Sequence, residues 1–268
     1  MPRLSSRALM TTASVLALIL AVTGAAIAAA PANAKFRTLD KTIGWPGQTF
    51  NGVECYGRPQ GFGPFDYNDP ETSRIGGFAQ LTGGGYANPL VMVEHAHFTS
   101  VVEQLERGQA GALNADIDYT LRAFPNHPRA LWTMARYYLR LLTAEGEEKL
   151  KGMEFQRSGY PPPECYFQRA KVFAPYDGMV SAIYGIYLHR RDKLQQALAE
   201  YAIAEKQHPD HAEILYNIGL LQVDLGDLDK AKGYAKRAKE LGYPLSGLQR
   251  KIKRLESEAS ARSERLNQ

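Results

Sequence analysis

The stretch AEILYNIGLLQVDLGDLDKAKGYAKRAKELGY, residues 212–243, decides the fold of this chain. Its apolar residues recur at helical spacing in two runs, the first of which contains Leu215 and Ile218. Between the runs stand Gly226 and Asp227, two residue types that break helices and favour turns. The stretch therefore predicts two short helices joined by a tight turn.

The same pattern occurs one copy earlier, at a constant distance of 34 residues. The residues that keep this distance are Pro175 and Pro209, Gly185 and Gly219, Ala197 and Ala231, Tyr201 and Ala235, and Ala204 and Ala238. A period of 34 with small residues at these offsets resembles the tetratricopeptide repeat family. The resemblance implies an all-α fold, a right-handed superhelical solenoid of stacked helix pairs.

The small residues have a physical reason. Gly185 and Gly219 on the first helices, and the alanines on the second helices, allow the two helices of a pair to approach closely. Neither helix can bury its apolar face alone, so we expect stability to come from stacking on neighbouring pairs.

Weaker copies extend the pattern towards the N-terminus. The expected repeats cover residues 92–125, 128–175, 178–209 and 212–243, and the second of them contains an insertion over residues 143–163. Residues 245–266 are amphipathic and are expected to form the C-terminal capping helix. The resemblance is closest in the last third of this region.

The N-terminus has the composition of a secretory signal. Residues 1–7 carry two arginines and no acid, residues 8–30 carry no charge, and Ala32 and Ala34 supply the small residues of a cleavage site. A retained membrane helix is the alternative, because the uncharged run is about 20 residues long. We expect cleavage after Ala34 and a periplasmic or secreted product without a membrane span.

After the signal, composition divides the chain near residue 90. Residues 35–90 are rich in Gly, Pro and aromatic residues, and they are expected to be irregular. Removal of residues 1–34 lowers the formal charge from +4 to +2, because two arginines and no acid are lost, so no global basic field indicates a nucleic acid partner. The basic end, residues 230–268, is interpreted as a solvated cap, and contact with an acidic surface is the alternative.

The chain contains two cysteines, Cys55 and Cys165. An even number of cysteines in an exported protein predicts a disulfide. Two free buried thiols are the alternative, since neither cysteine has a His or a second Cys at metal-binding spacing.

Two groups of polar residues were candidates for chemistry. His95 and His97 could bind a metal ion, but residues two apart on a helix point about 200° apart. The same geometry separates Asp116 from Asp118, so both are expected at the surface. The sequence has no recognised catalytic motif and no cofactor is expected. The sequence favours a non-enzymatic protein, and the alternative is a small enzyme or an envelope-assembly component with its site in the Gly-rich segment 35–90.

The family resemblance implies a concave groove, lined by the first helices, that receives a peptide or a partner domain. The residues expected to line this protein-binding groove are Tyr137, Arg140, His189, Arg190, Tyr216 and Asn217. Tyrosine and arginine are residue types that often anchor protein interfaces. Packing of the N-terminal segment into the groove is the alternative use of this surface.

Overall fold

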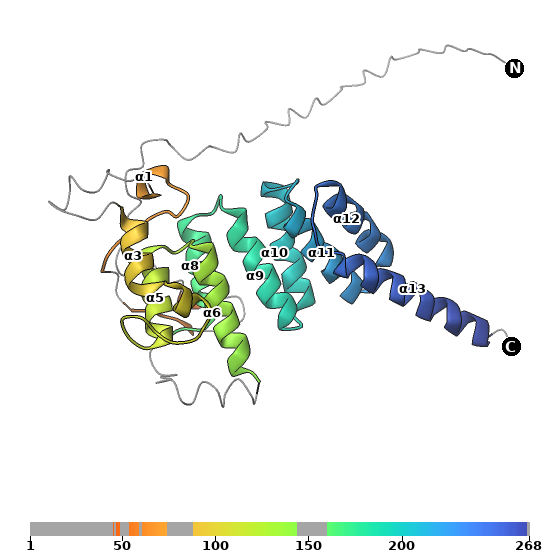
Figure 1. Cartoon of the computed structure of the whole chain (residues 1–268), viewed down its shortest axis with the longest axis horizontal. Helices are drawn as coiled ribbons and strands as arrows, with labels where there is room; N and C mark the ends of the chain where they lie inside the picture. The colour runs from red at the N-terminus through yellow and green to blue at the C-terminus, as the bar shows by residue number, and fades with distance from the viewer. Residues whose placement is uncertain are drawn as a thin grey trace, which may run out of the picture. The chain divides into compact units, whose positions relative to one another are not determined.

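The computed structural model describes residues 45, 47–48, 54–58, 61–73, 88–143 and 160–266 (Figure 1). The predicted signal peptide, residues 1–34, lies outside these ranges, and so do most of segment 35–90 and most of the insertion 143–163. From residue 88 onwards the described chain is α-helical, which confirms the all-α prediction.

The helices follow one another with short connections. They are α1 (Pro70–Ser73), α3 (Pro89–His97), α4 (Ser100–Glu103), α5 (Leu113–Ala123), α6 (Pro128–Leu141), α8 (Pro163–Phe173), α9 (Gly178–Arg190), α10 (Leu194–Gln207), α11 (Ala212–Asp224), α12 (Leu228–Glu240) and α13 (Gly247–Leu266). A short antiparallel strand pair, β1 (Gly47–Gln48) and β2 (Glu54–Cys55), precedes them.

Side chains at the turns determine where the helices begin. Asn88, His127, Asp177, His211 and Asp227 each occupy an N-cap position and accept a hydrogen bond from a backbone N–H in the first turn. Such caps satisfy donors that have no partner inside the helix. Proline opens α3, α6 and α8, where its missing N–H is not needed.

The helices pack in pairs, and the pairs are stacked. α9 packs along α10 and α11 packs along α12, while α10 also contacts α11. The first helices of successive pairs adjoin as well, since α6 contacts α9 and α9 contacts α11. α6, α9 and α11 therefore form a continuous row, which positions the candidate site described below.

Two of the glycines that recur at 34 residues lie at close contacts between helices. A β-carbon added at Gly185 of α9 would lie 2.8 Å from two ring carbons of Tyr201 on α10. One added at Gly219 of α11 would lie 2.4 Å from a methyl group of Leu248 on α13. Real β-carbons essentially never come this close. The observed packing against the Tyr201 ring therefore requires glycine at position 185, whereas at position 219 the end of the Leu248 side chain would have to shift.

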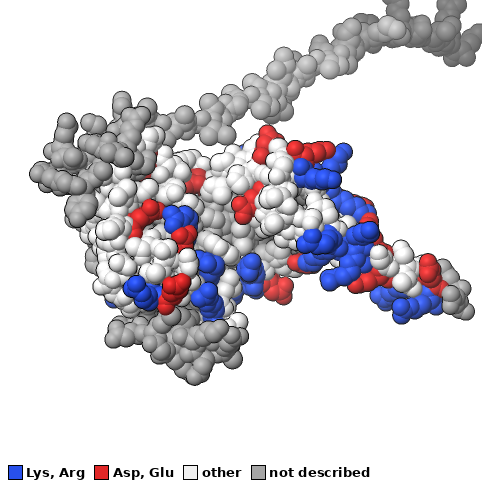
Figure 2. Space-filling model, viewed as in Figure 1, with Lys and Arg blue, Asp and Glu red and all other residues white. Residues whose placement is uncertain are grey.

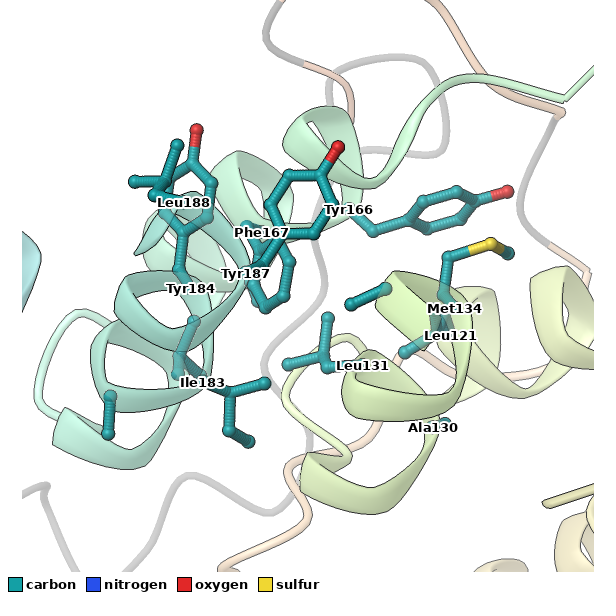
Figure 3. Packing of buried hydrophobic residues seen from close by; sticks show 14 of the residues in the cluster. Leu121, Ala130, Leu131, Met134, Tyr166, Phe167, Ile183, Tyr184, Tyr187 and Leu188 are labelled. Carbon is teal, nitrogen blue, oxygen red and sulfur yellow. The ribbon is translucent and has the colours of Figure 1, made fainter. Parts of the chain in front are cut away.

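The main core lies between α6, α8 and α9 (Figure 3). Phe167 stacks on Tyr184 with 4.6 Å between ring centroids, and Leu131 of α6 and Ile183 of α9 belong to the same cluster. Burial of such side chains contributes about 1.5 to 3 kcal/mol each to folding. A second cluster joins α11, α12 and the start of α13.

A disulfide joins the N-terminal segment to α8, as predicted: the sulfur atoms of Cys55 and Cys165 are 2.05 Å apart. Trp45 lies beside this link, with its ring 5.1 Å from that of Tyr166 and the guanidinium of Arg169 5.0 Å from its centroid. The described residues around Trp45 and Cys55 thus pack on α8.

Residues 61–73 are joined to two turns through a polar network. Buried Asn126, in the α5–α6 turn, donates hydrogen bonds to Asp66 (2.9 Å) and to Asp177 (3.0 Å), and its carbonyl oxygen accepts one from the backbone N–H of Tyr67 (3.0 Å). Asn68 also donates to Asp177, in the α8–α9 turn, at 2.7 Å. Burial raises the pKa of Asp177 although these hydrogen bonds oppose it.

α13 is attached to the rest of the chain through its first half. Leu248 and Ile252 are buried against α11 and α12, whereas most residues after Leu255 are exposed. Figure 2 shows Lys and Arg side chains gathered over the C-terminal helices, where residues 230–266 contain eleven of them and four Glu. None of the helices in the described ranges combines the length and the apolar character that crossing a bilayer requires.

Candidate protein-binding groove

The row formed by α6, α9 and α11 carries two adjoining hollows. Their volumes are about 430 Å³ and about 340 Å³. Five residues line both of them: Ile186, Arg190, Tyr201, Asn217 and Leu220. The hollows therefore form one groove, called here the α6–α9–α11 groove.

The larger hollow is mostly apolar. Trp132 of α6, Ile183 of α9 and Tyr216 of α11 line it, which places one anchor on each of the three helices. Trp132 is partly exposed although it contacts the core, because the row of helices leaves its outer side uncovered by described residues. Covering a surface of this kind with an apolar partner lowers the free energy, because apolar area is removed from water.

One end of the groove is closed by the connection between α12 and α13. The ring of Tyr243 packs against that of Tyr216, with 4.5 Å between centroids, and Leu245 is 56 % exposed at the rim. The α12–α13 connection thus supplies aromatic and aliphatic surface in addition to that of the helices.

Arg190, the last residue of α9, lies at the junction of the two hollows. Its guanidinium carbon is 5.4 Å from the centroid of the Trp132 ring, a geometry that allows a cation–π interaction. Within the described ranges, no carboxylate oxygen lies within 4.0 Å of Arg190. The side chain is exposed, so its charge is available to a molecule that enters the groove.

The other charges in the groove are mostly paired. In the smaller hollow, Asp224 accepts hydrogen bonds from Lys251 (2.5 Å) and from His189 (2.9 Å). Burial raises the pKa of Asp224, but these two partners outweigh it and the pKa is lowered. At the opposite end of the groove, Arg129 is bound by Glu94 and Glu103.

A buried hydroxyl lies against the groove. Tyr201 of α10 lines both hollows and is 1 % exposed, and its hydroxyl has no hydrogen-bond partner among the described residues. Burial raises its pKa above the ordinary value, Arg190 lowers it and Glu213 raises it. The charges that act on this hydroxyl are therefore those of two groove residues.

Four of the six predicted groove residues line the hollows. Arg190 and Asn217 line both, Tyr216 lines the larger one and His189 the smaller one. The structure brings these four together from α9 and α11.

The two predicted residues on α6 do not line the groove. Tyr137 is 5 % exposed and belongs to the main core, and the guanidinium of Arg140 donates to the carbonyl oxygen of Leu105, at 3.5 Å. For Tyr137 the correction has a simple origin. The distance of 50 residues between the turns that precede α6 and α9 aligns Tyr137 with Tyr187, a core residue, and aligns Trp132 with a groove position.

The expectation that Asp116 and Asp118 lie at the surface was wrong, because both are buried. Asp116 is 2.8 Å from Nδ1 of His97 and accepts a hydrogen bond from the backbone N–H of Ala110 at 2.9 Å. Asp118 accepts the hydroxyl proton of Tyr166 at 2.7 Å and is also paired with Arg122. Side chains of α3 and α8 thus supply hydrogen bonds that water would make to these carboxylates at the surface.

Metal chemistry gains no support from the histidines. His95 is exposed and His97 bonds Asp116, so the two do not converge. Over the residues that the structure describes, no group of three or more His, Cys, Asp or Glu side chains is placed to hold a metal ion.

The N-terminal segment does not occupy the groove where it is described. None of the described residues from Trp45 to Ser73 lines either hollow.

Compared with protein-family models and with curated proteins, the chain matches none of them. The groove therefore has to be interpreted from its own residues.

Proposed function

We propose that this protein is a periplasmic or secreted interaction scaffold with a tetratricopeptide-like solenoid, and that it binds a peptide or a partner domain in the α6–α9–α11 groove without catalysis. The observation that carries the proposal is the pair of adjoining hollows on three successive helices, lined by apolar and aromatic residues of which Trp132, Ile186 and Leu220 are partly exposed. Such surfaces are typical of protein interaction sites.

The fold supports the same proposal. The 34-residue spacing of small residues coincides with α9–α10 and α11–α12, two pairs whose first helices adjoin. A disulfide suits an oxidising compartment, which supports export. The described part of the Gly-rich segment is attached to α8 and to the α5–α6 and α8–α9 turns, and this structural role favours binding over an enzymatic site there.

Ile186 offers a direct test of the groove, because it lines both hollows and is partly exposed. We expect Ile186→Arg to remove partner binding by placing a charge in the apolar surface. Ile203 of α10 is 38 % exposed and lines neither hollow, so Ile203→Arg is the matched control.

Both variants and the unchanged protein would be expressed with an affinity tag, and co-purifying proteins would be quantified by mass spectrometry. Proteins captured by the unchanged protein and by Ile203→Arg, but lost with Ile186→Arg, would support the groove. Equal capture by all three would contradict it, provided circular dichroism shows that all three are folded.

Export has its own test. The intact mass of the protein recovered from the periplasm or the medium should correspond to a chain that begins at Lys35. A product that retains residues 1–34 in the membrane fraction would contradict cleavage.

A further inference from the structure

We infer, on the basis of the proposed function, that the groove binds a peptide segment with one acidic side chain between apolar side chains. The acid would pair with Arg190, and the apolar side chains would enter the hollows on either side of it. The juxtaposition of an exposed arginine with a mostly apolar hollow on one side, and with a hollow on the other side whose apolar residues are Ile186, Leu194 and Leu220, carries this inference.

Arg190 lies in the middle of the groove rather than at its edge, because it lines both hollows. Its stacking on Trp132 orients the guanidinium while leaving its N–H groups without a carboxylate partner in the described chain. A planar guanidinium can bind a carboxylate through two parallel hydrogen bonds. An acidic side chain of the occupant would find this geometry already formed.

The neighbouring charges favour an acid over a base at this position. A basic side chain would be repelled by Arg190, and Asp224 already accepts hydrogen bonds from Lys251 and His189. Two further carboxylates line the groove. Glu213 lies in the first turn of α11, where the helix N-terminus partly compensates its charge, and Asp192 is an exposed residue of the α9–α10 turn at the smaller hollow.

The hollows on both sides of Arg190 suit apolar side chains. Trp132, Ile183 and Tyr216 line the larger one. Ile186 and Leu220, which line both, continue the apolar surface past the arginine into the smaller one. Apolar cover over the ion pair would also exclude water and so strengthen the attraction.

The test uses a random peptide library displayed on phage, selected on the secreted protein. The unchanged protein should enrich peptides in which Asp or Glu is flanked by apolar residues. Arg190→Glu should lose this preference and enrich Lys or Arg instead. Arg262→Glu is the matched control, because Arg262 is an exposed residue of α13 that lines neither hollow, and it should select the same peptides as the unchanged protein.

One enriched peptide and its Asp→Asn or Glu→Gln form would then be labelled and titrated by fluorescence anisotropy. Removal of the acid should weaken binding to the unchanged protein about fivefold, as expected for a partly exposed ion pair of about 1 kcal/mol. It should not change binding to Arg190→Gln, a milder variant that serves also if Arg190→Glu does not fold.

The outcomes separate this inference from the proposed function. If the enriched peptides lose binding to Ile186→Arg but contain no preferred acid, the groove function stands and the acidic peptide is refuted. If no peptide is enriched, the acidic peptide is refuted, and co-purification with Ile186→Arg decides whether a partner domain uses the groove. If the enriched peptides bind Ile186→Arg equally well, the groove is refuted as their binding site.

Discussion

Replacement of Gly185 by alanine adds one methyl group at a close contact between α9 and α10. The new β-carbon would lie 2.8 Å from two ring carbons of Tyr201, which is 1 % exposed, so the ring or the helix has to move. Overpacking of this kind costs about 1 to 3 kcal/mol. Alanine also favours the helix by about 1 kcal/mol over glycine, which offsets part of the loss.

Gly233 of α12 provides a control for the helix preference alone. It is exposed, and an added β-carbon would have no neighbouring heavy atom within 4 Å. Gly233→Ala should therefore raise the free energy of unfolding by about 1 kcal/mol. The difference between the two alanine variants isolates the packing cost, for which we expect about 2 kcal/mol, within the range for overpacked cores.

Urea unfolding followed by circular dichroism would measure this difference. Thermal unfolding provides a second measurement. For a chain of this length, about 2 kcal/mol corresponds to a difference of roughly 4 to 8 °C in Tm between the two variants. If Gly185→Ala stabilises the protein as much as Gly233→Ala does, close helix approach at this glycine is not required, and our explanation of the small residues is wrong.

Three further predictions concern the disulfide, one buried histidine and the side chains of α6. Cys165→Ser should lower the free energy of unfolding by about 4 to 5 kcal/mol in the chain-entropy treatment, because the bond closes a loop of 110 residues, and chemical reduction of the unchanged protein should shift the urea midpoint equally. Burial lowers the pKa of His127 below its ordinary 6.5, so the unfolded chain binds this proton more readily and stability should fall as the pH drops below 6.5; in His127→Asn, which can keep the helix cap, urea midpoints should depend less on pH in this range. Tyr137→Ala should cost about 3 kcal/mol of stability without changing peptide affinity per folded molecule. Trp132→Ala should weaken peptide binding with little change in stability, as measured by anisotropy and thermal unfolding.

The helical character and the disulfide could be predicted because each depends on a local or compositional signal. Apolar residues at helical spacing predict helices wherever one face is buried, and two cysteines allow a single pairing. The close contact of Gly185 with α10 follows from the small residues that recur at 34, whereas the contact of Gly219 with Leu248 of α13 is not part of that pattern.

The details of the site depended on contacts that a sequence does not display. Asp116 and Asp118 are buried because His97 and Tyr166, which are 19 and 48 residues away, supply their hydrogen bonds. The groove residue of α6 was missed for a different reason. The insertion before α8 lengthens the spacing of this copy from 34 to 50 residues. Trp132 is recognised as a groove residue only when every position of α6 is compared with the position 50 residues later in α9.

The network around Asn126 has a mechanical consequence. The amide of Asn126, in the α5–α6 turn, donates hydrogen bonds to Asp177, in the α8–α9 turn, and to Asp66. Hydrogen bonds resist shear and changes of angle in a way that apolar contacts do not. The turns α5–α6 and α8–α9 are thus held at a fixed spacing by buried hydrogen bonds. Two bonds from α11 and α12 to the preceding pair, His189–Asp224 and Arg237–Glu205, are exposed, so water competes for them. Bending motions of this helical stack should therefore concentrate towards its C-terminal pairs, and α6 and α9 should act as the stiff wall of the groove against which α11 opens and closes.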